Sequence, residues 1–506
     1  MPTSEPESES TSQSSAAGPA ALASLTSLAQ EADVGLLDPL PAGTRAAVQS
    51  SDGAYLRHLL RIEAQWTSVL ADHGITTREH AEAAAAAADP AEYDLLSLAH
   101  AGQDGGNPLI PVLKAMRAKV SSPGAIHIGA TSQDIMDTAM MLMATDVSAT
   151  ILSDVRAAVG SLAELATEHR QTPMVARSLA QHSLPSTFGL RAAGWLSGLA
   201  QAGRRLEAAT AELPVQWGGA AGTMAALAGR LDRESRQGTL APGVDAFTLV
   251  EDLAAQLGLA APAGPWHTNR LPVTGVAAAL ADVVAACGKI ANDVLISARI
   301  ENGELGEPLA AGRGGSSAMP HKQNPVLSVM IHAGALSAPG SLAQVLTAAG
   351  AANEERPDGA WHAEWPALRQ LLRTAGGAAA RTAELVGGLR VNTEKMAENL
   401  NLVGPLLVSE RLMAELAPVL EEQAGGEPGS GKARLQQIVD RSLAAGGRDG
   451  GAGESEAGFR ALLRAELPAS VTDAELDGLL DPAHYTGEAV RLVDRMVAEY
   501  RGFADS

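Results

Sequence analysis

The segment GRGGSSAMPHKQNP, residues 312–325, brings together several residue types that could serve one reaction. Gly314 and Gly315 allow backbone N–H groups to converge on one point, as they do in anion-binding nests and oxyanion holes. Hydroxyl groups and a cation lie beside them, at Ser316, Ser317 and Lys322. The segment therefore predicts a site that holds an anion or stabilises a negative charge as it develops.

Two other interpretations of this segment stay open, although both are less favoured. A flexible linker is typical of Gly- and Ser-rich stretches, but Met319, Pro320 and Asn324 are not linker residues. A phosphate-binding loop requires the pattern GxxxxGK[ST] after a strand, and neither feature is present in the sequence.

Long helical patterns surround the segment. The run from 134 to 170 has no Pro and only Gly160 as a weak breaker, which predicts a helix of about 55 Å at 1.5 Å per residue. Further helices are expected at 54–74, 187–212, 273–301 and 326–349, with Gly/Pro-rich loops at 214–222, 261–272 and 306–325. Long helices joined by polar, glycine-rich loops predict a large helical bundle.

The expected fold class is therefore all-α, in three domains with a long central helical bundle. Residues 1–18 are mainly Ser, Glu, Pro and Gly and predict a disordered tail. We expect an N-terminal helical domain at 19–121, the central bundle at 122–365 and a C-terminal helical domain at 366–506. Within the last, the Gly-rich stretch at about 425–458 is expected to form mobile loops.

The charge balance limits the partners of the chain. It has 506 residues, with 37 Lys and Arg against 58 Asp and Glu, for a formal charge of −21. Such a charge repels nucleic acid and anionic lipid surfaces, and no apolar stretch is expected to be long enough to span a bilayer. The one cysteine, Cys287, cannot form an internal disulfide, and the acidic N-terminus lacks the basic start and the apolar run that are typical of a signal peptide. A cytoplasmic protein is expected.

No cofactor and no metal are expected. The histidines lack a ligand spacing such as HExxH, and one cysteine cannot build a multi-cysteine zinc site. The sequence also contains no dinucleotide-binding fingerprint and no Walker loop.

Four segments of the chain resemble motifs of the fumarase/aspartase superfamily, in the order of that superfamily. They are GATSQDIMDT (129–138), ARSLAQHSLPSTFG (176–189), QWGGAAGTMAAL (216–227) and GSSAMPHKQNP (315–325), the last similar to the signature loop GSSxMPxKxNP. The flanks PWHTNRLPV (265–273) and ERPDGAWHAEW (355–365) look most like bacterial 3-carboxy-cis,cis-muconate cycloisomerases. The resemblance covers nearly the whole chain except the N-terminal tail and parts of the Gly-rich C-terminal region.

The resemblance implies a homotetramer with a twenty-helix core, in which three chains contribute to each active site. It implies small anionic carboxylate substrates and removal of a proton from the carbon beside a carboxylate. Ser316 maps to the base of the superfamily, and Lys322 and Asn324 map to carboxylate-binding positions. The remaining binding candidates are Thr131, Ser132, Gln133, Ser178, Gln181, Ser317, Met319 and, more weakly, His127, while His182 is a candidate catalytic acid.

Plainer roles stay open for several of these residues. Thr131 and Ser132 precede a long helix, where hydroxyl side chains commonly cap the free N–H groups. Gln181 and His182 can equally be polar groups satisfied inside the core.

The chain departs from the superfamily at a proton-donating pair. Many members carry a His in a pattern like RTHxQ, where this chain has Leu179, and a partner Glu five residues after the signature Asn, where it has Val329. Neither Leu nor Val can donate a proton to a leaving group. The leaving group is therefore expected to be a weak base, such as a carboxylate or nitrite, because general acid catalysis is otherwise worth about 10²–10⁴-fold.

Three functions remain. The preferred one is cycloisomerisation of 3-carboxy-cis,cis-muconate. The alternative is a C–N lyase that releases fumarate, with nitrosuccinate favoured over adenylosuccinate as the substrate. A non-catalytic structural protein is the least favoured, because Ser316, Lys322 and Asn324 are all present.

Overall fold

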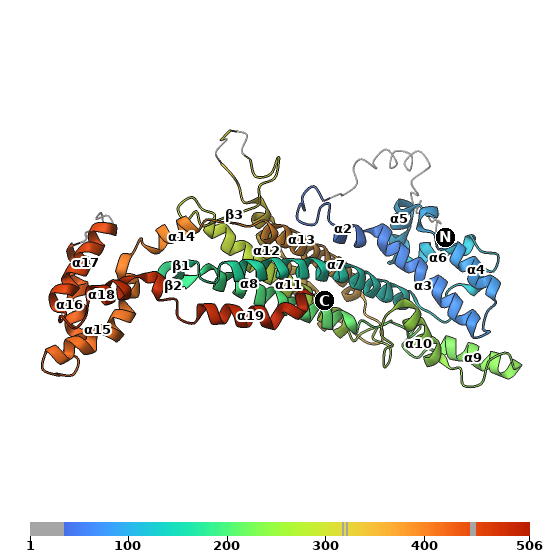
Figure 1. Cartoon of the computed structure of the whole chain (residues 1–506). Coiled ribbons are helices and arrows are strands. Elements are labelled where there is room, and N and C mark those ends of the chain that lie inside the picture. The colour runs from blue at the N-terminus through green and yellow to red at the C-terminus, as the bar shows by residue number, and fades with distance from the viewer. Residues whose placement is uncertain (1–34, 316–317, 320–321, 446–451, 506) are drawn as a thin grey trace, which may run out of the picture.

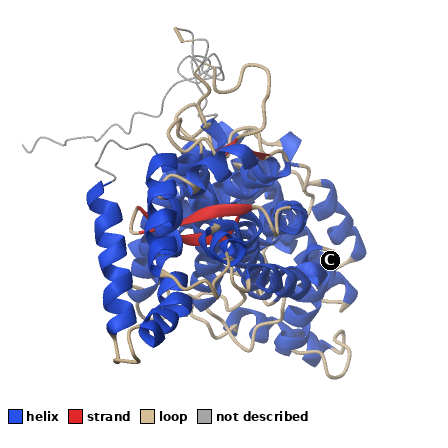
Figure 2. Ribbon diagram, turned by 60° about the vertical axis from the view of Figure 1, so that its left-hand side comes forward, coloured by secondary structure: helices blue, strands red, loops and turns tan. Residues whose placement is uncertain are grey.

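The computed structural model describes residues 35–315, 318–319, 322–445 and 452–505. Long helices run lengthwise through an elongated molecule (Figure 1). They are α7 (Ser132–Glu168), α8 (Phe188–Ala211), α11 (Leu271–Ser297), α12 (Val326–Gly350) and α13 (Gly359–Gly387). The expected all-α class and long central bundle are confirmed, and Figure 2 shows how little strand the described residues contain.

Shorter helices gather at both ends of the bundle. One end holds α3 (Asp52–Asp72), α4 (Arg78–Ala86), α5 (Leu95–Gly105), α6 (Leu109–Ala118), α9 (Ala225–Gln237) and α10 (Ala246–Leu257). The other holds α14 (Thr393–Leu400), α15 (Ser409–Gln423), α16 (Ser430–Ala445), α17 (Ala452–Glu466) and α18 (Asp473–Leu480). The short helix α2 (Arg45–Gln49) packs along the bundle against α7 and α13. The strands are β1 (Pro173–Ser178), β2 (Gln181–Thr187), β3 (Leu305–Gly306) and β4 (Arg390–Val391), and short 3₁₀ helices lie at Pro90–Glu92, Pro123–Ala125, Gly404–Val408 and Pro482–His484.

Helix α19 (Ala489–Ala504) returns from the C-terminal end and packs along α7 and α8. Its Phe503 ring is buried against Gly203 of α8, where a Cβ atom would lie 2.4 Å from the ring. The boundary predicted between the central and C-terminal domains, after residue 365, lies inside α13. The last residues of the chain thus pack with the bundle, because apolar side chains on α19 complete its core.

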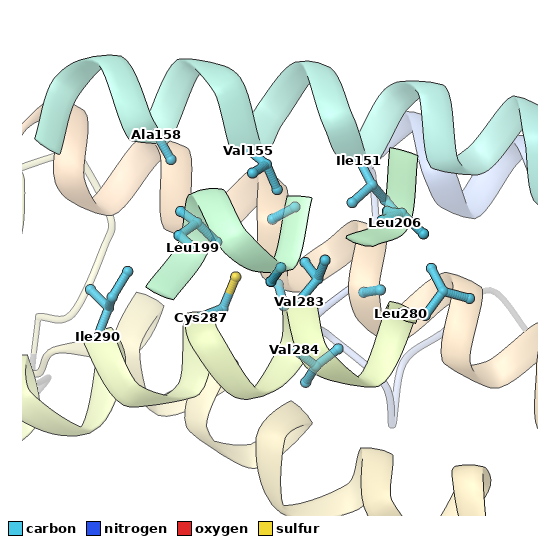
Figure 3. Packing of buried hydrophobic residues seen from close by; sticks show 14 of the residues in the cluster. Ile151, Val155, Ala158, Leu199, Leu206, Leu280, Val283, Val284, Cys287 and Ile290 are labelled. Atoms are coloured by element: carbon cyan, nitrogen blue, oxygen red, sulfur yellow. The ribbon is translucent and has the colours of Figure 1, made fainter. Parts of the chain in front are cut away.

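Small and branched side chains let the bundle pack closely despite the scarcity of aromatic residues. Figure 3 shows Val155 of α7 with Leu199 of α8 and Val283 and Cys287 of α11, all in one buried cluster. A Cβ atom at Gly288 would lie 2.4 Å from the Cβ of Ala335, so α11 and α12 approach more closely than a larger residue would allow. Such close approach lets small side chains pack the bundle densely.

Cys287 provides a test of this packing. Its side chain is fully buried, and burial raises the pKa of the thiol to about 12. Because the thiolate is the nucleophile, we expect no labelling by thiol reagents in the folded protein and rapid labelling in denaturant. Mass spectrometry after a timed exposure measures this, and equal labelling rates in both states would contradict the buried position.

The expectation that no apolar stretch is long enough to span a bilayer is wrong. Helices α7, α11 and α12 each contain a window long and apolar enough to cross a bilayer, by length and composition only. Their Ala, Val and Leu content is high because these residues build the bundle. In that window 78% of the residues of α7 are buried inside the chain but only 28% of those of α12, so α12 carries an uncovered apolar face.

The prediction of mobile loops at about 425–458 is also wrong for most of its length. The structure places α16 and α17 there, separated by residues outside the described range. Leu435 and Ile438 of α16 are buried with Phe459 and Leu463 of α17 in a C-terminal core that also includes residues of α15. Burial of these regularly spaced apolar side chains stabilises the two helices despite the nearby glycines, which disfavour helix.

Candidate active site

Five of the predicted binding residues lie in two groups at opposite ends of α7. Thr131, Ser132 and Gln133 are at its N-terminus, whereas Ser178 and Gln181 lie on the β1–β2 hairpin that follows its C-terminus. The 37 residues of α7 span about 55 Å at 1.5 Å per residue. One chain therefore does not bring the two groups together.

Asp134 holds the first group, at the N-terminus of α7, in place through hydrogen bonds. Its fully buried carboxylate accepts hydrogen bonds from the backbone N–H groups of Thr131 at 2.8 Å and of Gly218 and Gly219, both at 2.9 Å. It also lies 2.8 Å from Nε2 of His267. One buried carboxylate thus joins the start of α7 to two loops that are distant in sequence.

Arg356, which we did not single out in the sequence, lies at the same place. Its guanidinium donates to Oγ1 of Thr131 at 2.8 Å. Thr131 is also the N-cap of α7, so the capping role holds beside this contact. The signal in the sequence that could have identified Arg356 is a charged residue in a Gly/Pro-rich turn. Arg356 adds a positive charge to a helix N-terminus, where anions bind favourably.

Gln133 lies beneath this surface. Its side chain is fully buried, and its Nε2 donates to Asp137 at 3.1 Å and to the carbonyl of His267 at 2.9 Å. These contacts leave Oε1 of Gln133 without a hydrogen-bond partner among the described residues, and its contact with substrate stays a prediction. Ser132 is half-buried at the first turn of the helix.

The second group projects from the hairpin. Arg177 of β1 makes two hydrogen bonds, of 2.9 and 2.7 Å, to the buried carboxylate of Glu304. Asn399 of α14 donates to the same carboxylate at 2.9 Å. These contacts hold the base of the hairpin, and Ser178 and Gln181 are exposed beyond it.

The signature segment also forms a closed base. The backbone N–H and the side-chain Nδ2 of Asn324 donate to the carbonyl of Gly314 at 2.8 and 3.0 Å. Gly314 has a φ of +68°, and a Cβ there would lie 2.4 Å from the carbonyl oxygen of Asn324. The side-chain amide of Asn324 is expected from the resemblance to bind carboxylate. In this structure it donates to the carbonyl of Gly314 and so joins the two ends of the loop. Ser316 and Ser317 lie outside the described residues, and Met319 and Lys322 are exposed.

Backbone strain concentrates in or beside these segments. The non-glycine residues with positive φ in the described ranges are His127, Leu179, Ala180, Met224 and Glu354. Each costs conformational energy, of order 1–3 kcal/mol, and such residues persist where the surrounding structure holds them, most often at functional sites.

Comparison with known proteins identifies the family of the chain. A lyase family model matches residues 61–340. The chain is 43% identical to the nitrosuccinate lyase of Streptomyces davaonensis over 93% of this chain and 96% of that protein. It is 36% identical to a 3-carboxy-cis,cis-muconate cycloisomerase of Pseudomonas aeruginosa over 89% and 93% of the two chains. The chain belongs to the fumarase/aspartase superfamily of lyases and cycloisomerases.

A solved structure of this superfamily supports the fold in detail. The 3-carboxy-cis,cis-muconate lactonizing enzyme of Pseudomonas putida matches with a TM-score of 0.79 and 32% identity, covering 93% of this chain and 99% of that one. The all-α arrangement of the bundle is therefore that of the superfamily.

The departures from the superfamily pattern lie on accessible surface. Leu179 at the tip of the hairpin is 97% exposed, and Val329 in the first turns of α12 is 51% exposed. Neither apolar side chain is covered by the rest of the chain at these positions.

His182 is half-buried beside Arg177, and its Nδ1 has no hydrogen-bond partner among the described residues. Burial, and next the charge of Arg177, lower the pKa of His182. The imidazole is therefore neutral at neutral pH, which weakens its candidacy as a catalytic acid.

The lowered pKa of His182 has a measurable consequence for stability. A histidine whose pKa is lower in the folded state binds its proton more tightly when unfolded, so the protein loses stability as pH falls below about 6.5. We expect His182→Asn to lose less stability than the wild type between about pH 6.5 and pH 5. Thermal unfolding at both pH values measures this, with exposed His100→Asn as the control. Equal losses in wild type and His182→Asn would contradict it.

Proposed function

We propose that the protein is a C–N lyase that converts nitrosuccinate to fumarate and nitrite. The proposal rests mainly on Leu179 and Val329, which occupy the proton-donor positions of other superfamily members with side chains that cannot protonate a leaving group. Nitrite is a weak base and leaves without a proton. Between nitrite and carboxylate as leaving group, the 43% identity to a nitrosuccinate lyase favours nitrite over the function preferred from sequence.

The proposed reaction is an elimination across two carbons. Ser316 removes a proton from the carbon beside one carboxylate, and the charge that develops spreads onto that carboxylate. The bond between the neighbouring carbon and nitrogen then breaks, its electron pair leaves with nitrite, and a carbon–carbon double bond forms. Lys322 and the N–H groups near Gly314 and Gly315 stabilise the charge, a type of interaction worth about 3–4 kcal/mol for each donor.

The proposed enzyme is a cytoplasmic homotetramer whose sites are shared among copies. The length of α7 supports this, because the residues at its two ends meet only if they come from different chains. The uncovered face of α12 supports it too, since Leu336 is 71% and Leu346 52% exposed. Burying such a face against other copies removes apolar surface from water.

Product analysis tests the substrate. Purified protein is mixed with nitrosuccinate, and fumarate and nitrite are measured in the same sample. Equal molar amounts of both are expected, in proportion to enzyme concentration. Absence of nitrite at substrate concentrations that saturate a known nitrosuccinate lyase would refute the proposal.

A second candidate is cycloisomerisation of 3-carboxy-cis,cis-muconate. The fold match to the Pseudomonas putida enzyme favours it, and its carboxylate leaving group also needs no proton. Loss of muconate absorbance without nitrite production would support this candidate instead.

A further inference from the structure

Two buried glutamates that take no part in the proposed reaction lie three positions apart, between α11 and the signature segment. Glu304 is fully buried, and Glu307 is 8% exposed. A buried carboxylate costs free energy unless it accepts hydrogen bonds or pairs with a cation. The partners of these two carboxylates therefore identify the parts of the chain that they hold together.

The carboxylate of Glu307 caps the N-terminus of α12. Its Oε2 accepts a hydrogen bond from the backbone N–H of Leu327 at 3.0 Å, and its Oε1 accepts from the N–H and the hydroxyl of Ser328, both at 2.7 Å. Pro325, the N-cap residue of α12, has no side-chain oxygen that could do this. The first N–H groups of a helix lack partners within it, and a negative charge beside them is favourable. Glu307 thus joins the chain before the signature segment to the helix that follows it.

Glu304 connects the same stretch of chain to the β1–β2 hairpin. Its carboxylate accepts two hydrogen bonds from Arg177 of β1 and one from Asn399. Arg177 directly precedes Ser178 and lies opposite His182 in the hairpin. Two parallel hydrogen bonds between a guanidinium and a carboxylate fix the orientation of one group relative to the other. The hairpin is therefore attached to the stretch of chain that leads into the signature segment.

The backbone between the two glutamates is itself held in place. It forms β3, which pairs with β4, and Nε of Arg390 in β4 donates to the carbonyl of Glu307 at 2.8 Å. A Cβ atom at Gly306 would lie 2.7 Å from Nη2 of Arg390, so the guanidinium packs directly on this backbone. Helix α14, which follows β4, packs against β1 (Figure 1). We call residues 304–307 the shared base, because their two carboxylates contact the hairpin and the start of α12.

We propose that Glu307 is a positioning residue for the signature segment, which carries Ser316, and that the shared base aligns this segment with the β1–β2 hairpin. Glu307 acts by holding the start of α12, and Arg177 acts on the same base through Glu304. The catalytic roles of the segment and the hairpin rest on the proposed function. The connection between them rests on the contacts of the structure.

Limited proteolysis tests whether Glu307 holds the signature segment. Trypsin cleaves between Arg313 and Gly314, and cleavage of a native protein follows the population of the locally opened form. Glu307→Ala removes three hydrogen bonds to a charged group, so we expect cleavage after Arg313 to become at least about tenfold faster. Cleavage after Lys289, which lies within α11 and requires opening of the bundle, is expected to keep the wild-type rate. Mass spectrometry of the peptides measures both sites.

Steady-state kinetics separates positioning from a loss of stability. We expect Glu307→Ala to lower kcat by about 10- to 100-fold, because a misplacement of about 1 Å can cost 10²-fold. KM is expected to change less than kcat. In the Ser316→Ala background, Glu307→Ala should lower kcat no further, because no base is left to position. A residue that served stability alone would lower the active fraction equally in both backgrounds. Glu410→Ala, at an exposed glutamate in the first turn of α15, is the control.

Substitutions of Arg177 test the connection through the shared base. Arg177→Met removes both guanidinium hydrogen bonds from Glu304, and we expect cleavage after Arg313 to become roughly threefold faster, although Arg177 lies on another element. Arg177→Lys keeps a cation and is expected to stay closer to the wild-type rate. Arg205→Met, whose pair with Asp282 is largely exposed, is the control.

Unchanged cleavage after Arg313 in folded Glu307→Ala, an equal acceleration after Lys289, or an additive kcat loss in the Ser316→Ala background would each overturn the role of Glu307. Unchanged cleavage after Arg313 in Arg177→Met would overturn the connection to the hairpin. If Glu307→Ala does not fold, Glu307→Gln, which keeps one acceptor oxygen, decides the outcome.

The substrate does not have to be nitrosuccinate for this inference to hold. If the wild type converts 3-carboxy-cis,cis-muconate but releases no nitrite from nitrosuccinate, the proposed function fails, and the same kinetic pattern on the muconate supports the positioning role. If neither compound is converted, the proposed function and the positioning role both fail.

Discussion

Replacing Ser316 with alanine is expected to lower kcat by about 10²–10⁴-fold, the usual contribution of a positioned base. KM is expected to change little, because the hydroxyl acts on the transition state more than on the bound substrate. Steady-state kinetics on nitrosuccinate measures both constants. The loss should exceed that of any substitution in the remaining binding candidates, which act by orientation.

The matched control for this substitution is Ser235→Ala, an exposed serine on α9 outside both groups of the candidate site. It is expected to keep wild-type kcat. Unchanged turnover in Ser316→Ala, with correct folding shown by circular dichroism, would remove Ser316 from the role of base and leave the fold assignment intact.

Substituting Arg270 with methionine is expected to destabilise the fold by about 3–5 kcal/mol, since it leaves buried carboxylates without a cation. Arg270 is 3% exposed and makes two hydrogen bonds to Asp137, at 2.7 and 3.1 Å, and two to Glu364, at 3.1 and 2.6 Å. Burial already raises the pKa of Glu364, and Arg270 opposes this rise. Denaturant unfolding measures the loss.

The loss should depend on pH with a definite sign. Without Arg270, nothing opposes the rise that burial causes in the pKa of Glu364, so this carboxyl group holds a proton more readily in the folded than in the unfolded state and stability falls as pH rises. The difference from wild type is therefore expected to be larger at about pH 8 than at about pH 5. Arg205→Met is the control, because its pair with Asp282 is largely exposed and worth at most about 1 kcal/mol. A pH-independent loss would contradict this explanation.

The main features of the fold could be predicted because they depend on local patterns. A run without Pro, such as 134–170, has one favourable structure, and α7 occupies most of it. The errors arose where local composition and tertiary packing disagree. Glycines around Leu435 and Phe459 suggest loops, but these apolar side chains form a core with α15 that holds α16 and α17 in place.

The candidate site was predictable only in part. The residues at the start of α7 and on the β1–β2 hairpin were singled out because their segments resemble superfamily motifs, and their binding roles stay predictions. No spacing rule links Asp134 to Gly218, because the two residues are far apart along the chain. The same holds for the contacts of Glu63 with His127 and of Arg356 with Thr131. The burial of Gln133 could not be predicted for the same reason, because it depends on His267, which is 134 residues away.

Because α7 is long, a substitution at one of its ends leaves the residues at the other end unchanged, which has a consequence for the proposed assembly. A chain altered at Thr131 keeps an intact hairpin, and a chain altered on the hairpin keeps an intact Thr131. Mixed oligomers of two such inactive chains would then contain some sites built wholly from undamaged parts. Two defective alleles can thereby restore activity together that neither provides alone.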